Sequence, residues 1–171
     1  LELGVDALGF ILTESRRQVT LERAAELLHG VPPFADSVAV VCNPETEQLR
    51  RVVQSGLFTH VQFHGSEAPE LLEDLPVKTI KAFGIATEDD MERALVYESA
   101  DFFLFDARVG KQSGGTGQTL PWEVVRNAFI PKPFILAGGL GPENVAAAIG
   151  FCRPAAVDLN SKVETAPGRK D

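Results

Sequence analysis

The chain alternates between short apolar runs and amphipathic stretches, and this alternation limits its possible folds more than any other feature. Strands without a polar face are typical of parallel sheets that helices cover on the outside. Stretches with helical spacing separate the runs, so the sequence predicts a repeated βα unit. We predict seven strands, at 7–12, 37–42, 60–64, 79–85, 102–107, 134–138 and 156–160, and six helices, at 21–29, 45–54, 69–75, 88–97, 122–129 and 143–150.

Residues at the helix ends agree with this pattern. Thr20 and Thr87 stand where N-caps belong, and acidic residues follow each of them in the first turn. Pro121 and Pro142 fall near the starts of two further helices, where a missing N–H costs little. Neither a linker nor a low-complexity segment interrupts the repeat.

The number of strands favours a closed barrel. Seven parallel strands are one fewer than a (β/α)8 barrel contains. Residues 1–4 resemble the last turn of a helix, with Gly4 as its stop. We therefore expect one α/β domain over residues 1–171, a (β/α)8 TIM barrel whose first strand and last helix lie outside the chain. A doubly wound sheet is the alternative, and it is disfavoured because no G-x-G-x-x-G follows a first strand.

Composition excludes several classes of function. The net charge of −8 argues against a nucleic-acid or membrane-surface partner. Two cysteines do not make a disulfide framework, so we expect a cytoplasmic protein. No metal site is expected, because the three histidines do not recur with acids at several strand ends. A small anionic substrate stays compatible with the charge if backbone N–H groups gather at one site.

Two loops at the predicted mouth of the barrel indicate a phosphate site. In such barrels the working residues follow the C-terminal ends of the strands, and the last two loops commonly bind phosphate. Gly138 and Gly139 precede a helix, where glycine lets a phosphate approach the backbone closely. Asn160 and Ser161 follow the next strand. Two ordinary tight turns are the alternative, and the placement of both loops favours phosphate binding.

Asp106 is the strongest candidate for a catalytic group. It ends a strand after four large apolar residues, so its carboxyl is expected to be poorly solvated, as suits a general acid. A helix N-cap, or an ion pair with Arg108 or Lys111, is the structural alternative. The glycine-rich loop 110–117 that follows has the composition of a mobile loop. It does not match a Walker phosphate loop, because no Lys-Ser/Thr follows it.

Four further residues are candidates for substrate contacts. Arg17 follows the first predicted strand and could hold a carboxylate with two hydrogen bonds, although a lone arginine is more often a solvated cation. Gln62 and His64 end the third strand, and Asp158 ends the last. For His64, ligand contact and structural hydrogen bonding are equally plausible. Cys42 also ends a strand, but we interpret it as a small buried hydrophobic residue.

Taken together, these motifs resemble the phosphoribosylanthranilate isomerases in order, spacing and context. The resemblance spans essentially the whole chain, and several motifs in register are far more specific than any one of them. The matching residues are 7–10 with 15–17, 61–65, 105–106, 114–117, 136–140 with 142–145, and 157–158 with 163–168.

The resemblance implies a cofactor-free Amadori rearrangement of N-(5-phosphoribosyl)anthranilate to the corresponding 1-deoxyribulose 5-phosphate in tryptophan biosynthesis. By the family pattern, Asp106 is the general acid and Arg17 binds the anthranilate carboxylate. Gln62, His64 and Asp158 would line the site. Backbone groups around the four phosphate-loop residues, Gly138, Gly139, Asn160 and Ser161, would hold the phosphate.

The chain departs from the family pattern in three places, and the missing closing helix is one of them. The family's general base is a cysteine in a Lys-x-Cys-Gly motif on the first strand, and we expect that strand upstream of residue 1. Cys42 does not align with it, so the 171 residues alone are expected to be inactive or nearly so. The family usually has Ser-Ser-Gly where this chain has Asn160-Ser161-Lys162. Lys162 could add charge near the phosphate or face solvent.

The sequence alone leaves two other functions possible. Another phosphate-binding barrel, such as indole-3-glycerol phosphate synthase or a pentulose-phosphate epimerase, is disfavoured because its lysines or its metal-binding set are not evident. A barrel that binds phosphate without catalysis is the alternative from a different class. The expected partner is a small phosphorylated substrate, and the active form is expected to be a monomer or a homodimer.

Overall fold

The computed structural model describes residues 4–106, 122–166 and 168–170 and separates into two compact units, 1–80 and 81–171. Strands β1 to β7 follow one another in chain order in one hydrogen-bonded sheet, as expected for a repeated βα unit. Within the described residues, no helix combines the length and apolar character needed to span a membrane. The α/β class and the order of strands are confirmed, while the single domain, the closing strand and the closing helix stay predictions.

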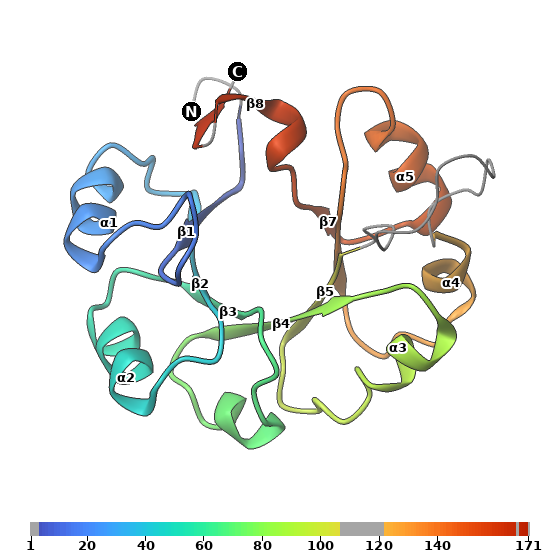
Figure 1. Ribbon diagram of the computed structural model, residues 1–171, viewed down its shortest axis with the longest axis horizontal. Coiled ribbons are helices and arrows are strands. Elements are labelled where there is room, and N and C mark those ends of the chain that lie inside the picture. The colour runs from blue at the N-terminus through green and yellow to red at the C-terminus, as the bar shows by residue number, and fades with distance from the viewer. Residues whose placement is uncertain (1–3, 107–121, 167, 171) are drawn as a thin grey trace. The chain divides into compact units, whose positions relative to one another are not determined.

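The first unit contains three parallel strands with a helical segment after each. β1 pairs with β2 and β2 with β3, and the strands' buried residues include Val41, Val61 and Phe63. Helices α1 and α2 lie on the same side of these strands (Figure 1). The elements of this unit are β1 (Ala7–Ile11), α1 (Leu21–Leu28), β2 (Asp36–Val41), α2 (Thr46–Gln54), β3 (His60–Phe63) and the 3₁₀ helix η1 (Pro69–Leu72).

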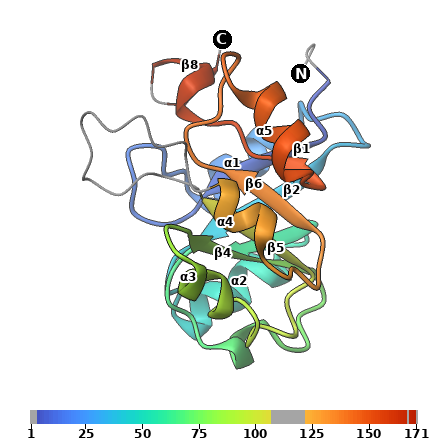
Figure 2. The same ribbon diagram turned by 90° about the vertical axis from the view of Figure 1, so that its right-hand side faces the viewer.

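The second unit begins within β4 (Lys78–Gly84) and repeats the pattern. β5 pairs with β6 and β6 with β7, again in parallel. Helices α3, α4 and α5 follow one another along one face of these strands (Figures 1 and 2). The elements are α3 (Glu88–Glu92), β5 (Phe102–Asp106), α4 (Trp122–Asn127), β6 (Phe134–Ala137), α5 (Val145–Cys152), β7 (Ala156–Val157), the 3₁₀ helix η2 (Ser161–Val163), β8 (Glu164–Ala166) and β9 (Arg169–Lys170).

An aromatic cluster fills the core of the second unit. The rings of Phe83 and Phe103 lie edge to face with centroids 5.7 Å apart, and Phe105 contacts Phe134 at 5.5 Å. Each such pair contributes about 0.5–1.5 kcal/mol beyond the burial of its area. The cluster fixes β5 and β6 side by side, and with them the residues that follow at the strand ends.

Both predicted N-caps are confirmed. The Thr20 hydroxyl accepts a hydrogen bond from the backbone N–H of Arg23 at 3.1 Å. At α3, the Asp90 carboxylate accepts from the backbone N–H groups of Ala86 at 2.9 Å and Thr87 at 3.0 Å. Burial alone would raise the pKa of Asp90, but these hydrogen bonds outweigh it and hold that pKa below its ordinary value.

Several predicted helices differ from the structure. The stretch 69–75 forms only the short η1, and α3 ends at Glu92 rather than at residue 97. Beyond Glu92 the backbone N–H groups of Ala94, Leu95 and Tyr97 each bond the carbonyl three residues earlier, which gives tight turns instead of an α-helix. The hairpin of β8 and β9 was not predicted, because strands of three and two residues carry too little periodicity to detect.

Candidate functional site

Three neighbouring strands of the second unit end at the same level and carry three of the candidate groups. Asp106, the last residue of β5, pairs with Ala137 of β6, which Gly138 follows directly. Leu136 pairs with Val157, and the backbone N–H of Asp158 donates to the Leu136 carbonyl at 2.9 Å. The parallel register therefore brings Asp106, the Gly138-Gly139 pair and Asp158 to one edge of the sheet.

The Asp106 side chain is buried at this edge. The residue is 8% exposed, and Phe103, Leu104 and Phe105 before it are each at most 1% exposed. Its backbone carbonyl accepts a hydrogen bond from Ile85 N–H at 3.0 Å, which ties the end of β5 to the end of β4. Arg108, Lys111 and the glycine-rich loop 110–117 lie outside the described residues.

The loop after β6 needs glycine. Gly138 has φ 97° and Gly139 has φ 65°, a region that side chains with a Cβ rarely adopt. Asn144 then folds the loop back onto the start of α5. Its amide Nδ2 donates to the Gly139 carbonyl at 3.0 Å, and its Oδ1 accepts from Gly141 N–H at 2.9 Å. This turn is also the reason that α5 begins at Val145 rather than at the predicted 143.

The loop after β7 contacts the loop after β6. The Lys162 ammonium lies 3.0 Å from a carboxylate oxygen of Glu143, with both side chains about half exposed. The pKa of Glu143 is lowered, first by a hydrogen bond from its own backbone N–H and then by Lys162. A Cβ at Gly141 would lie 2.9 Å from the Lys162 Cβ, so glycine permits this approach. Lys162 is therefore paired with an acid.

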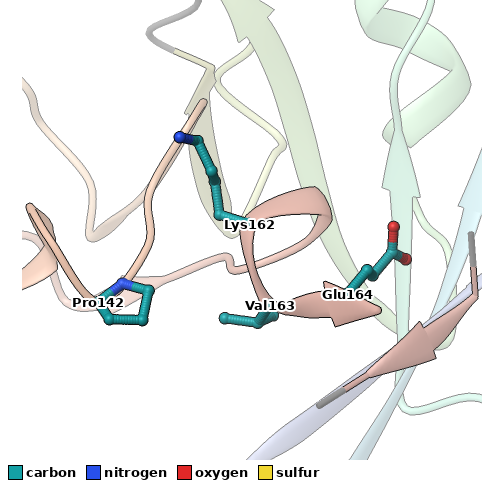
Figure 3. A pocket seen from close by; sticks show the side chains of 4 residues that line it. All are labelled: Pro142, Lys162, Val163 and Glu164. Atoms are coloured by element: carbon teal, nitrogen blue, oxygen red, sulfur yellow. The ribbon is translucent and has the colours of Figure 1, made fainter. Parts of the chain in front are cut away.

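A small hollow opens beside this contact. It has a volume of about 300 Å³ and is lined by Pro142, Lys162, Val163 and Glu164. Figure 3 shows the Val163 side chain directed towards Pro142, and the Lys162 and Glu164 side chains directed away from both. Asn160 and Ser161 stand just before this segment and are exposed. The two predicted phosphate loops thus lie against each other within the second unit.

The first unit carries Arg17, Gln62 and His64. Gln62 is 7% exposed at the end of β3, and its amide Nε2 lies 3.2 Å from Nδ1 of the exposed His64. Arg17 is half-buried after β1, and its backbone N–H donates to the Ser15 hydroxyl at 3.0 Å.

A buried carboxylate that sequence reasoning missed supports the loop after β3. Glu67 is 5% exposed and accepts hydrogen bonds from the backbone N–H groups of Asn43 at 2.8 Å and Gly65 at 3.0 Å. The Asn43 side chain in turn accepts from Ser66 N–H at 2.7 Å. Asn43 has φ 45°, a conformation that asparagine tolerates better than most residues. An asparagine directly after a strand, here Asn43, is the only sequence feature that could have indicated these hydrogen bonds.

The expectation that Cys42 is buried was wrong. It lies just beyond the end of β2 and is exposed, whereas Cys152 in α5 is buried. In the parts of the chain that the structure describes, no three His, Cys, Asp or Glu side chains group as metal ligands would. The arrangement of the second unit can accept an anion beside a buried acid, and that of the first offers an arginine and a hydrogen-bonding pair.

The family model and the most similar curated relatives name one family. The family model described as N-(5'phosphoribosyl)anthranilate (PRA) isomerase matches residues 1–171. The N-(5'-phosphoribosyl)anthranilate isomerase of Petrotoga mobilis is 51% identical over 98% of this chain and 82% of its own length. A crystal structure of the isomerase from Thermotoga maritima matches with a TM-score of 0.87 and 39% identity, over 99% of this chain and 84% of that one. A further structure of such an isomerase, in complex with reduced 1-(o-carboxyphenylamino)-1-deoxyribulose 5-phosphate, matches with a TM-score of 0.84 and 38% identity, over 99% of this chain and 83% of that one.

Proposed function

Because the chain belongs to the N-(5'-phosphoribosyl)anthranilate isomerase family of tryptophan biosynthesis, we propose that its strand-end residues carry out the Amadori rearrangement of N-(5'-phosphoribosyl)anthranilate. The substrate is an aldosylamine with two anionic ends, a ribose 5-phosphate and an anthranilate carboxylate. The product is the 1-deoxyribulose 5-phosphate ketosamine. The observation that carries the proposal is the buried Asp106 beside the Gly138-Gly139 loop, in a chain that matches the family model from end to end.

Asp106 is the proposed general acid. It donates a proton to the ribose ring oxygen while the amine nitrogen forms a double bond to C1′, so that the C1′–O bond breaks and the ring opens. Its position favours this step, because a carboxyl with little contact to water can deliver its proton to a bound oxygen without competition from solvent. A base then removes the proton from C2′, and the resulting enolamine takes up a proton at C1′ and loses the proton of its C2′ hydroxyl to give the ketone.

The phosphate is the proposed ligand of the two loops of the second unit. Gly138 and Gly139 expose backbone where a Cβ would be strained, and α5 follows with its N-terminus towards this loop. Asn160 and Ser161 add an amide and a hydroxyl from the adjoining loop. The contact between Lys162 and Glu143 supports this assignment, because it holds the two loops against each other.

The anthranilate end is assigned to the remaining candidates. Arg17 is the proposed partner of the carboxylate, because a guanidinium can donate two parallel hydrogen bonds to it. Gln62 and His64 form one hydrogen-bonded pair, which suits a polar lining of fixed orientation, and Asp158 lines the site from the end of β7.

The general base is proposed to be the cysteine of the family's Lys-x-Cys-Gly motif, a motif that the 171 residues do not contain. Neither cysteine present is assigned that role. Burial raises the pKa of the Cys152 thiol, which disfavours the thiolate, and Cys42 is exposed beyond β2. The reaction needs no cofactor, since it consists of proton transfers to and from the substrate.

The test is turnover of the natural substrate by the full-length protein. We expect conversion of N-(5-phosphoribosyl)anthranilate to the ketosamine, identified by NMR of the C1′ methylene that the reaction creates. The same ribosylamine without its phosphate should react with kcat/KM lower by about 100-fold or more, because remote binding energy is lost. An unchanged substrate, or equal rates with and without the phosphate, would refute the proposal.

A further inference from the structure

The ammonium group of Lys170 is bound by three oxygens of the C-terminal segment. It donates to the Asn160 backbone carbonyl at 3.0 Å, to the Asn160 side-chain Oδ1 at 2.8 Å and to the Glu164 Oε1 at 3.1 Å. A lysine ammonium has three N–H donors, so these contacts can use all of them. The Lys170 side chain is nevertheless 48% exposed, and burial alone does not hold it in this place.

The hairpin of β8 and β9 fixes the side chain instead. Glu164 pairs with Lys170 across the two strands, and its side chain is only 4% exposed. The same Glu164 oxygen accepts the backbone N–H of Gly168 at 3.1 Å, and the Thr165 hydroxyl donates to the Arg169 carbonyl at 3.2 Å. A carboxylate so little exposed needs a cation beside it, because an unpaired buried charge is costly.

Lys170 also contacts Asn160, a residue of the second predicted phosphate loop. Asn160 has neither helical nor extended backbone angles, with φ −127° and ψ −96°. Its carbonyl also accepts Val163 N–H at 3.3 Å, and Lys170 is the group that binds both this carbonyl and the side-chain amide oxygen. Because Oδ1 accepts a hydrogen bond from Lys170, Nδ2 is the other polar group of the Asn160 amide, and as a donor it has the polarity that an anion requires.

We propose that Lys170 is a positioning residue for the phosphate site: it orients Asn160 through a Lys170–Glu164 clamp and does not itself touch the ligand. The inference deepens the proposed function and rests on Asn160 being a phosphate ligand. Lys162 differs from Lys170, because it pairs with Glu143 of the other loop and contacts neither oxygen of Asn160 in the described contacts.

The substitution Lys170→Met removes the ammonium but keeps a side chain of similar length. We expect the dissociation constant of inorganic phosphate and the KM for the phosphorylated substrate to rise by about tenfold, while kcat changes by less than about threefold. Lys170→Arg can still donate to both oxygens of Asn160 and should recover most of the loss. Lys132→Met is the matched control, because Lys132 also binds a backbone carbonyl of this unit, Glu98 O at 2.6 Å, away from these loops.

The measurements are isothermal titration with inorganic phosphate and steady-state kinetics of the full-length protein, with circular dichroism as the check of folding. Should Lys170→Met not fold, Glu164→Gln keeps the hairpin bond to Gly168 and weakens the clamp, and a rise of about threefold in the phosphate dissociation constant is expected. A lower melting temperature with unchanged phosphate affinity and KM would overturn the inference and leave the proposed function intact. A wild-type protein that neither binds phosphate nor turns over the substrate would overturn the proposed function itself.

Discussion

Replacing the buried Glu67 with alanine should destabilise the first unit more than any other single carboxylate substitution in that unit. The Glu67 carboxylate accepts the backbone N–H groups of Asn43 and Gly65, which lie after β2 and after β3. Glu67→Ala leaves both partly buried donors without this acceptor. A hydrogen bond to a charged group contributes about 1.5–3 kcal/mol, so the loss of two amounts to about 3–6 kcal/mol of unfolding free energy.

Urea denaturation followed by circular dichroism measures this loss. With a slope of about 2 kcal/mol per molar urea, a loss of about 4 kcal/mol lowers the transition midpoint by about 2 M. Glu67→Gln keeps one oxygen that can accept both N–H groups and should cost about half as much. Glu70→Ala is the control, because Glu70 is an exposed residue of η1 and its loss should change the free energy by no more than about 0.5 kcal/mol.

The same substitution should also affect the site. Gly65 directly follows His64, so a loop released from Glu67 no longer fixes the imidazole against Gln62. We expect KM for the substrate to rise in Glu67→Ala under conditions where the variant is still folded. A midpoint within about 0.5 M of the wild type, or a Glu67→Gln variant as unstable as Glu67→Ala, would refute the reasoning that the two backbone donors dominate.

Three further predictions concern other contacts. Gly141→Ala should separate the two phosphate loops, because its Cβ would lie 2.9 Å from the Lys162 Cβ; we expect weaker phosphate binding by titration calorimetry, and equal affinity would contradict this. Because the pKa of Asp90 is lower in the folded protein than in the unfolded chain, its carboxylate stabilises the fold at pH values above the unfolded pKa of about 4. This contribution disappears as the pH falls through the lower pKa of the folded protein. Asp90→Asn should therefore lower the melting temperature at pH 7 but not near pH 2, and a difference independent of pH would count against it. Iodoacetamide at pH 8 should label the exposed Cys42 well before Cys152, whose pKa burial raises, as peptide mass spectrometry can show; equal rates would mean that α5 opens easily.

The strands were predictable because their sequences are nearly continuous apolar runs. The run that ends at Asp106 consists almost entirely of large apolar residues, and the structure places β5 there with the same start. The caps at Thr20 and Thr87 were predictable for a similar reason, since a cap uses partners within three residues. Local pattern therefore located every strand from β1 to β7 and the edge of the sheet at which the candidate residues lie.

What the sequence did not predict depends on partners that are distant in the chain. Glu67 binds Asn43, 24 residues earlier, and Lys170 binds Asn160, 10 residues earlier, and neither spacing is a local motif. Cys42 was predicted to be buried because it continues an apolar run, but β2 ends one residue before it. The roles of Asp106, Arg17 and the phosphate-loop residues stay predictions, since the structure gives their positions and not their chemistry.

The most direct test of the account is the kinetics of Asp106→Asn in the full-length protein, beside Asp89→Asn as a matched control. Asp89 is an exposed carboxylate on α3 of the same unit, and its loss should leave both constants unchanged. Asparagine keeps the size of Asp106 but cannot donate an acid proton, so kcat should fall by about 100- to 10,000-fold while the affinity for inorganic phosphate stays within about threefold. A kcat within about threefold of the wild type would show that the proton for ring opening comes from another group.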